Sequence, residues 1–170
     1  MKKKETTEIK EQPKSRHPLV TIVIVAGMAL TLVINVLTLL NCWSMIGYAQ
    51  WEFGAFSHDP DIQEAHRTVF FVLLAQMLVA VVATVFILIY YVKLLEWKKR
   101  GFWGLVIASA VAAAANVMMS GYITKAFSMI DVDVSGDIPF QIAWTMAAIA
   151  LLYAVLRIKK NGVRCWEQLE

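Results

Sequence analysis

Four long apolar stretches, separated by short charged segments, constrain this 170-residue chain more than any other feature. They cover residues 19–43, 69–92, 102–123 and 138–158, and each matches the roughly 20 residues that a helix needs to cross a bilayer. Backbone polar groups inside a bilayer must be paired within the protein, so such stretches form helices there. The pattern predicts an all-α, integral membrane fold: an up-down-up-down bundle of four transmembrane helices over residues 19–158.

The two ends of the chain are polar. Residues 1–18 are charged and contain no aromatic residue, so they cannot bury enough surface to fold, and we expect a basic, disordered cytoplasmic tail. Residues 159–170 are expected to form a second, short cytoplasmic tail. The first apolar stretch exceeds the ~7–15 residues of a secretory signal core, and no small-residue cleavage site follows it, which predicts a retained span.

The placement of lysine and arginine predicts how the chain is oriented. Fourteen of the 16 Lys and Arg residues lie in residues 1–18, in the turn 93–101 or from Arg157 onward, and only Arg67 and Lys125 lie in the opposite loops. Cytoplasmic loops carry such an excess, so both termini are expected to be cytoplasmic. Because the charges segregate by loop, the net charge of +3 indicates the lipid bilayer as the partner and no nucleic acid.

Residues 44–68, between the first two apolar stretches, are predicted to form an outer loop. Trp51 and Phe53 suit the headgroup level of a membrane, as interfacial anchors or as part of a short surface-lying segment. The pair Asp59-Pro60 is typical of a helix start, with an acidic N-cap followed by proline at the first helical position. We therefore expect the second helix to begin at Pro60, outside the membrane.

The third apolar stretch is rich in small side chains. Gly104, Ala108 and Ala112 recur at four-residue spacing and so share one stripe of a helix. Small residues allow helix backbones to approach closely in a membrane, where no hydrophobic force drives helices together. The stripe predicts that this helix is the one against which the others pack. It could also bind another membrane protein or a second copy of the chain.

The interiors of the four stretches contain no Asp, Glu, Lys, Arg or His. Proton-coupled transporters, ion pumps and voltage sensors place ionisable residues there, so these classes are not favoured. The sequence also shows no nucleophile–base pair, no phosphate-binding glycine loop and no paired catalytic carboxylates. We therefore expect a protein that is not an enzyme and has no cofactor.

Each stretch does carry an uncharged polar residue at a similar depth. At ~1.5 Å per residue, these side chains lie roughly 20–26 Å from the inner boundary of a hydrocarbon core about 30 Å thick. One interpretation is a set of interhelical hydrogen bonds that fix helix register. The other is a ligand-binding polar pocket that opens outward and holds a small neutral molecule or a lipid headgroup. The candidates are Asn35, Gln76, Asn116, Gln141 and Thr145.

The second outer loop carries a candidate metal site. Asp131, Asp133 and Asp137 alternate around a Ser-Gly pair, as in the first half of an EF-hand-like calcium loop. Position twelve of such a loop would be Ile142, so the bidentate glutamate is missing. A weak cation site and a solvated acidic turn both fit this pattern.

Two predicted cytoplasmic turns share a pattern of lysines, a glycine and an aromatic residue. The first reads WKKRGFW over 97–103, and the second reads KKNGVRCW over 159–166. Glycine suits the left-handed cap of a helix end, lysines complement its negative pole, and tryptophan anchors the interface. Either two helices end in the same way, or a helix hairpin has been duplicated.

The segment KKNGVRCWEQL also resembles the C-terminus of uncharacterised small four-span inner-membrane proteins of Bacteroidetes-like bacteria. The resemblance covers this segment alone. It implies a multi-pass fold in a bacterial cytoplasmic (inner) membrane, and no catalytic residue carries over from it. With the absence of catalytic patterns, we expect a non-catalytic small polytopic membrane protein that is an interaction, regulatory or assembly component of a membrane complex. The alternative is a small oligomeric channel or transporter with a polar site in the outer leaflet half.

Overall fold

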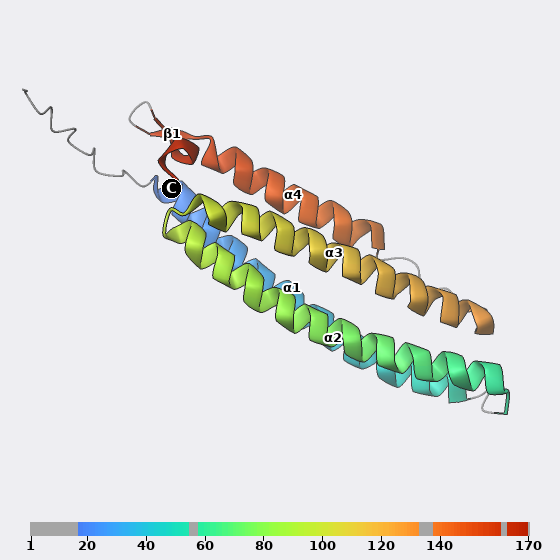
Figure 1. Ribbon diagram of the computed structural model, residues 1–170. Helices are drawn as coiled ribbons and strands as arrows, with labels where there is room; N and C mark the ends of the chain where they lie inside the picture. Colours follow the sequence, from blue (N-terminus) through green and yellow to red (C-terminus); the bar gives the residue numbers. More distant parts are fainter. Residues whose placement is uncertain (1–16, 55–57, 133–137, 161–162, 170) are drawn as a thin grey trace, which may run out of the picture.

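The computed structural model describes residues 17–54, 58–132, 138–160 and 163–169, and this part of the chain is almost entirely helical. Four helices follow one another, and the C-terminal residues add two very short strands and a 3₁₀ turn (Figure 1). The predicted all-α class is confirmed. The elements are α1 (Pro18–Gly54), α2 (Pro60–Leu95), α3 (Lys99–Phe127), the 3₁₀ helix η1 (Ser128–Ile130), α4 (Ile138–Leu156), β1 (Lys159–Lys160), β2 (Val163–Arg164) and the 3₁₀ helix η2 (Cys165–Gln168).

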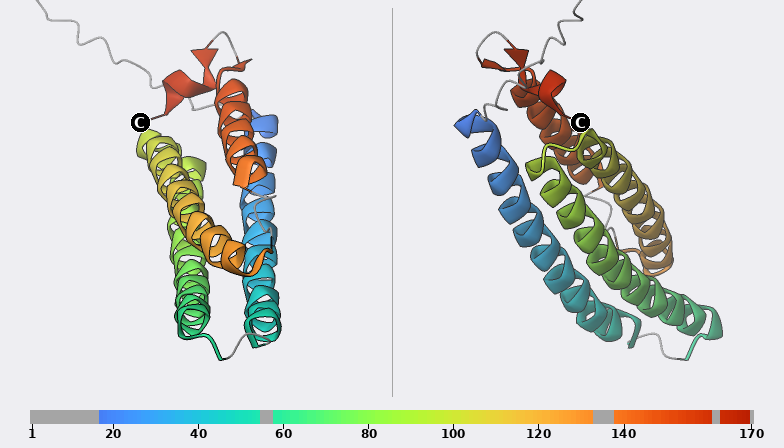
Figure 2. Two further views of the ribbon diagram at one scale, coloured as in Figure 1. Left: turned by 90° about the vertical axis from the view of Figure 1, so that its right-hand side faces the viewer. Right: turned by 60° about the vertical axis from the view of Figure 1, so that its left-hand side comes forward.

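Helix α2 lies between α1 and α3. Helices α1 and α2 form a long antiparallel hairpin, and α3 returns along α2 at an angle (Figure 2). The shorter α4 lies against α3 and α1 over one half of the bundle. The sequence predicted that the third helix would be the one against which the others pack, but the two most extensive helix contacts both involve α2, with α3 and with α1. Helix α3 contacts α2 and α4, and α4 reaches α1 as well.

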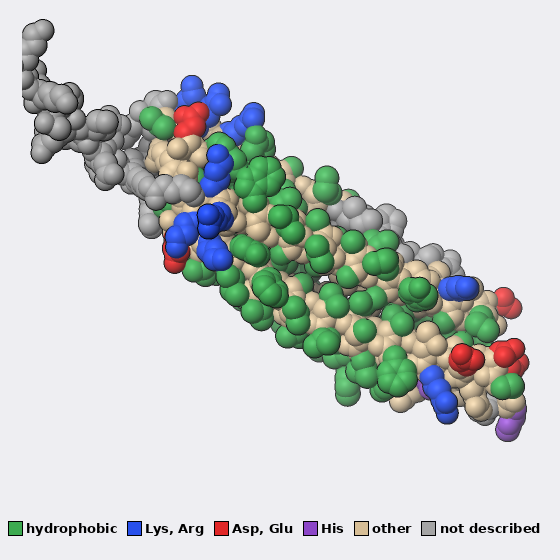
Figure 3. Space-filling view, viewed as in Figure 1, with side chains coloured by type: hydrophobic (Ala, Val, Ile, Leu, Met, Phe, Trp, Pro, Cys, Tyr) green, Lys and Arg blue, Asp and Glu red, His purple; other side chains and the backbone are tan. Residues whose placement is uncertain are grey.

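The exposed surface of the helices is apolar. Three segments are long and apolar enough to cross a membrane, Pro18–Gly54, Pro60–Leu95 and Lys99–Ile130, and a shorter apolar segment, Thr145–Leu156, belongs to α4. Figure 3 shows apolar side chains along the middle of one face, Lys and Arg gathered at one end, and Asp and Glu mostly at the other. A soluble protein does not expose an apolar surface of this extent. The chain is therefore a membrane protein with helices of membrane-spanning length.

Most of the loop predicted over 44–68 is helical. Helix α1 continues through Gly54, and α2 begins at Pro60, as expected from its N-cap. The Asp59 carboxylate accepts a hydrogen bond from the backbone N–H of Asp61 at 2.9 Å. The prediction of the helix start is confirmed, while the prediction of a long loop is wrong. Aromatic and small residues of this region pack between α1 and α2. These contacts stabilise the longer helices.

Two separate hydrophobic clusters hold the bundle together. The first, which we call the terminal cluster, lies at the end where α1 begins and the C-terminal segment folds. The second, the hairpin cluster, lies towards the α1–α2 connection. The terminal cluster consists of Val20, Ile24, Tyr91, Leu94, Trp97, Phe102, Leu105, Leu152, Val155, Leu156, Cys165 and Leu169. The hairpin cluster consists of Cys42, Ala49, Phe53, Ala65, Val69, Leu73, Ile123, Ala126 and Phe127.

Two glycines allow α2 and α3 to approach closely. A Cβ atom at Gly101 would lie 2.6 Å from the backbone nitrogen of Leu94, and one at Gly104 would overlap the ring of Tyr90. Gly101 was predicted to take the left-handed conformation at the end of the second helix. Instead Trp97 has the positive φ, at 62°, and Gly101 lies in the first turn of α3. Gly101 is therefore needed for backbone proximity rather than for a left-handed cap.

The C-terminal segment folds back onto the helix ends. Strands β1 and β2 pair in antiparallel fashion, and Cys165 is fully buried in the terminal cluster. The Trp166 ring packs edge-on to Phe102 at 5.1 Å between centroids, and Lys99 Nζ lies 5.2 Å from the Trp166 ring centroid. Residues expected to form a simple tail thus cover one end of the bundle.

Candidate functional site

A cavity of about 620 Å³ lies between the terminal and hairpin clusters. Helix α1 lines it with residues from 30–41, α3 with residues from 105–116 and α4 with residues from 145–152. Ile87 and Tyr91 of α2 form its base. Helices α1 and α3 make few close approaches along this stretch, because α2 separates them. The middle of the bundle therefore contains an open space, whereas both of its ends are well packed.

The cavity opens sideways along α1. Leu30, Val33 and Leu37 line it and are nevertheless 42%, 55% and 59% exposed. Helix α4 has only 19 residues and accompanies α1 for part of its length (Figure 2). A molecule that surrounds the helices can thus reach the cavity without crossing either hydrophobic cluster.

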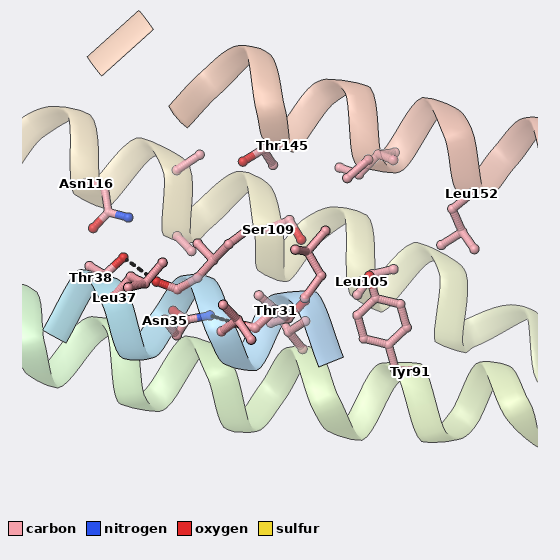
Figure 4. A pocket seen from close by; sticks show the side chains of 18 of the residues that line it. Thr31, Asn35, Leu37, Thr38, Tyr91, Leu105, Ser109, Asn116, Thr145 and Leu152 are labelled. Carbon is pink, nitrogen blue, oxygen red and sulfur yellow. Dashed lines mark hydrogen bonds between the residues drawn. The ribbon is translucent and has the colours of Figure 1, made fainter. Parts of the chain in front are cut away.

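The lining combines apolar walls with uncharged polar groups. Figure 4 shows Asn116 of α3 and Thr145 of α4 pointing toward α1, with the ring of Tyr91 rising from α2. The described lining residues include no Asp, Glu, Lys, Arg or His. The polar side chains are Thr31, Asn35, Thr38, Asn41, Tyr91, Ser109, Asn116 and Thr145.

Three polar side chains of α1 that line the cavity donate hydrogen bonds to carbonyl groups of their own helix. The Thr31 hydroxyl donates to the carbonyl of Gly27 at 2.8 Å, and the Asn35 amide donates to the carbonyl of Thr31 at 2.8 Å. The Thr38 hydroxyl donates to the carbonyl of Ile34 at 2.9 Å. The hydroxyl oxygens of Thr31 and Thr38 keep lone pairs, and the amide of Asn35 keeps a second N–H group. This wall of the cavity therefore offers both acceptors and donors.

Asn116 has an unused acceptor. Its Oδ1 atom is buried and has no hydrogen-bond partner among the described residues. An unpaired buried acceptor costs about 1–3 kcal/mol, because it has lost its hydrogen bonds to water. The atom is closed to a water-sized probe, so a donor in the cavity reaches it only if the Asn116 side chain turns.

Three of the five predicted polar-ring residues meet at the cavity. Asn35, Asn116 and Thr145 line it from three different helices. Gln76 is buried, at 7% exposure, but does not line the cavity. Gln141 belongs to α4, and its side chain lies outside the described part of the structure. Depth along the helix placed these residues at one level, but only the packing decides which of them face each other.

Several other polar residues of the lining, among them Thr31, Thr38 and Ser109, were not predicted as site residues from the sequence. Thr31, Asn35 and Thr38 follow the spacing i, i+4, i+7 and therefore share one face of α1. Ser109 precedes Asn116 by two turns and lies on the same face of α3. A search for polar stripes within the apolar stretches, rather than for single polar residues, would have found them.

The predicted calcium loop is only partly described. Asp131 is exposed and has a left-handed backbone, with φ at 58°, at the end of η1. Asp133 and Asp137 lie outside the described residues. Within the described part of the chain, no three or more His, Cys, Asp or Glu side chains are grouped so that they could hold a metal ion.

The predicted small-residue contact stripe of α3 faces the interior of the molecule at two of its three positions. Gly104 packs against Tyr90, and Ala112 lines the cavity. Ala108 is half-buried. Binding of a second protein through the whole stripe would require α2 to move away from Gly104.

Known protein families, characterised proteins and solved structures give no match to this chain. The resemblance of its C-terminal segment to four-span inner-membrane proteins therefore stays a prediction.

Proposed function

We propose that the chain is a non-catalytic, small polytopic membrane protein that serves as an interaction, regulatory or assembly component of a membrane complex. Its binding site within the bilayer is the cavity between α1, α3 and α4. The observation that carries the proposal is the character of this cavity. It is uncharged, partly polar and open sideways, and it lies between two well-packed clusters.

Four spans and cytoplasmic termini complete the proposal. Helix α4 has 19 residues, about 28 Å at ~1.5 Å per residue, which is close to the thickness of a hydrocarbon core. The segment Thr145–Leu156 of this helix is apolar. The end of the bundle rich in Lys and Arg also holds the start of α1 and the C-terminal segment (Figures 1 and 3). This supports a cytoplasmic location for that end in a bacterial inner membrane.

The chemistry of the lining favours binding over catalysis. Hydroxyl and amide groups orient a ligand by hydrogen bonds. General acid–base catalysis needs a group that exchanges protons near neutral pH, such as a histidine or a perturbed carboxylate. The described lining offers amides, aliphatic hydroxyls and a single phenol. We therefore propose a role in which the protein binds and does not transform its ligand.

A channel or transporter is the second candidate, and the polar cavity is the observation that favours it. In a single copy, however, the terminal cluster and the hairpin cluster close the bundle on both sides of the cavity. A continuous polar path would have to form between copies of the chain. The measurement that separates the two candidates is ion or solute flux through liposomes that contain the purified protein. Flux above that of empty liposomes would favour the channel.

Site-specific photocrosslinking tests the binding site. A benzophenone amino acid at Val33, in the cavity wall, is compared with one at Val85, which is similarly exposed on α2 but does not line the cavity. The two positions are 55% and 52% exposed. We expect a discrete adduct from Val33 in native membranes and only diffuse lipid adducts from Val85. Identical patterns from both positions would contradict the proposed site.

Cysteine labelling tests the topology. Cys42 and Cys165 are buried and are first replaced by Ala. With a membrane-impermeant maleimide, Trp51→Cys should react in intact cells and Lys98→Cys only after lysis. The fourth span requires Asp131→Cys to behave as Trp51→Cys does, and Arg164→Cys to behave as Lys98→Cys does. Labelling of Lys98→Cys in intact cells would overturn the orientation. Labelling of position 131 and position 164 from the same side would remove the fourth span.

A further inference from the structure

We propose that the basic end of the bundle carries a binding site for an anionic phospholipid, whose negatively charged headgroup is held by Lys99 of α3 and Arg157 of α4. The inference rests on the proposed span of the helices across a bilayer, which brings this end to a membrane surface. It is independent of the cavity. Three features carry it: two cations held on touching aromatic rings, no carboxylate of the described chain paired with them, and an exposed apolar strip that continues from Lys99 along α3.

Aromatic rings bring Lys99 and Arg157 together from different helices. Lys99 Nζ lies 5.2 Å from the centroid of the Trp166 ring, and the guanidinium carbon of Arg157 lies 4.7 Å from that of Tyr153. The two rings pack edge-on, at 5.8 Å between centroids, and both also contact Phe102. Cation–π contacts restrict where these long side chains go. The two cations therefore lose less conformational freedom when an anion binds.

Both cations keep donors for an anion. Lys99 and Arg157 are exposed. The guanidinium uses one N–H group, which donates from Nη2 to the Tyr153 hydroxyl at 2.6 Å, and four others remain. Phosphate oxygens accept charge-assisted hydrogen bonds from ammonium and guanidinium groups. The pair is therefore suited to a phosphate-containing headgroup.

The carboxylates described at this end pair with other cations. Glu96 accepts a hydrogen bond from Lys98 at 2.6 Å. Glu167 lies 3.9 Å from Arg164. Within the described part of the chain, the two cations of the proposed site have no acidic partner. They are therefore available to a bound anion.

An exposed apolar strip starts at the same place. Lys99, Trp103 and Ile107 follow one another at four-residue spacing and so lie along one side of α3. Trp103 and Ile107 are exposed and belong to a segment of membrane-spanning length. Figure 3 shows Lys and Arg gathered where the apolar surface of the bundle ends. A lipid headgroup at Lys99 would place its acyl chains along this strip, whereas a soluble phosphate would use the cations alone. The strip therefore favours an anionic lipid, the partner of basic clusters beside membrane helices.

Native mass spectrometry of the full-length protein in a neutral detergent tests the inference. Phosphatidylglycerol, which is anionic, is compared with phosphatidylcholine of the same acyl chains, which is zwitterionic. Lys99→Gln/Arg157→Gln should weaken the binding of phosphatidylglycerol about 25-fold, because each cation near a membrane surface contributes about fivefold. It should leave the binding of phosphatidylcholine unchanged. Glycerol phosphate, which has a phosphate but no chains, should not displace the lipid at equal concentration.

Two control variants with the same change in net charge locate the effect. Lys98→Gln/Arg164→Gln removes two cations from the same end, but these already pair with carboxylates. Arg67→Gln/Lys125→Gln removes two cations near the other ends of α2 and α3. Both variants should bind phosphatidylglycerol nearly as the parent does.

A conservative variant and a photoactivatable lipid test the geometry. Lys99→Arg/Arg157→Lys keeps both charges and should keep most of the binding. A phosphatidylglycerol with a diazirine near the glycerol end of one acyl chain should label residues 103–107. Thermal unfolding shows whether each variant is folded. If Lys99→Gln/Arg157→Gln does not fold, Lys99→Gln alone takes its place, with an expected loss of about fivefold.

The outcomes separate this inference from the proposed function. Equal affinity for the two lipids, or an equal loss in the Lys98→Gln/Arg164→Gln control, would overturn the inference and leave only diffuse attraction. Displacement by glycerol phosphate would overturn the lipid in favour of a soluble phosphate. None of these results bears on the cavity, whose test is the adduct from position 33. Labelling of Lys98→Cys in intact cells would overturn the proposed orientation and keep the lipid preference, because the binding assay in detergent does not depend on orientation.

Discussion

Gly104 of α3 lies directly against the aromatic ring of Tyr90 of α2, so that a methyl group at position 104 would overlap the ring. This contact is one of the closest approaches between the two helices that pack most extensively. Membrane helices gain much of their association energy from such close approaches, since lipid provides no hydrophobic drive. The α2–α3 pair therefore depends on the absence of a side chain at this position.

Gly104→Ala is expected to destabilise the protein by about 1–3 kcal/mol, because overpacking forces the ring or the helices apart. Gly121→Ala is the matched control. A Cβ atom there meets nothing within 4 Å, and removing a helical glycine is worth about 0.5–1 kcal/mol. Unfolding in detergent, followed by circular dichroism, measures both variants. The double variant Gly104→Ala/Tyr90→Ala should recover part of the loss, and equal stability of the two glycine variants would contradict the prediction.

Asp59→Ala should loosen the start of α2. The carboxylate caps the backbone N–H of Asp61, and loss of an N-cap costs about 0.5–2 kcal/mol. Asp59→Asn keeps an acceptor at the same place and should be close to the parent protein. Amide hydrogen exchange in the first turn of α2 is the sensitive readout. Faster exchange in both variants, or in neither, would show that the cap does not hold this turn.

The pair Lys98–Glu96 should make stability depend weakly on pH. The hydrogen bond from Lys98 Nζ to Glu96 at 2.6 Å, together with its charge, holds the pKa of the Glu96 carboxyl below its usual range. A carboxyl with a lowered pKa stabilises the fold above its unfolded-state pKa, and the contribution disappears as the pH falls through its folded-state pKa. Both side chains are about half exposed, at 57% and 50%, so the effect is small and is screened by salt.

Comparison of the parent with Glu96→Gln measures this effect. The difference in Tm between the two proteins should be present at about pH 7 and shrink in acid, as the pH falls through the lowered folded-state pKa of Glu96. Lys98→Gln should remove the same dependence, because it removes the donor. At about 1 M salt the difference at neutral pH should shrink. A difference that persists unchanged into acid would show that Glu96 acts through some other contact.

Trp166→Ala is expected to release the C-terminal segment. The ring packs edge-on to Phe102 and Tyr153, at 5.1 and 5.8 Å between centroids, and such pairs contribute about 0.5–1.5 kcal/mol each beyond their burial. Trypsin should then cut at Lys159 and Arg164 faster than in the parent. Trp51→Ala, at a ring that is 75% exposed, is the control and should leave the cleavage rate unchanged. Equal rates for both variants would contradict the docked arrangement.

The helices were predictable from the sequence, because each is marked by a long apolar stretch with local start signals such as Asp59-Pro60. The fold of the C-terminal segment was not predictable from the sequence. Trp166 packs on Phe102, more than 60 residues away in the chain, and no local pattern announces a contact at that distance. The length of α1 was underestimated for the same reason, since Phe53 is helical through its contacts with Phe127 and His66 on other helices.

The depth of the polar site residues along their helices was predictable from the sequence, but the direction in which each side chain points was not. An amphipathic helix reveals its buried face by periodicity, but a helix that is apolar all round does not. Asn35 and Gln76 were therefore placed at one level, although only Asn35 faces the cavity. The cavity itself depends on how α3 crosses α2, and Gly101 and Gly104 mark where the two helices come close without fixing the angle between them.

Helix α1 has 37 residues and α2 has 36, so the hairpin is about 54–55 Å long, well beyond a hydrocarbon core of about 30 Å. Even at a tilt of about 20°, such a hairpin extends beyond that core by roughly 20 Å. At least one of its ends therefore stands in the headgroup region or the aqueous phase, where molecules outside the bilayer can contact it.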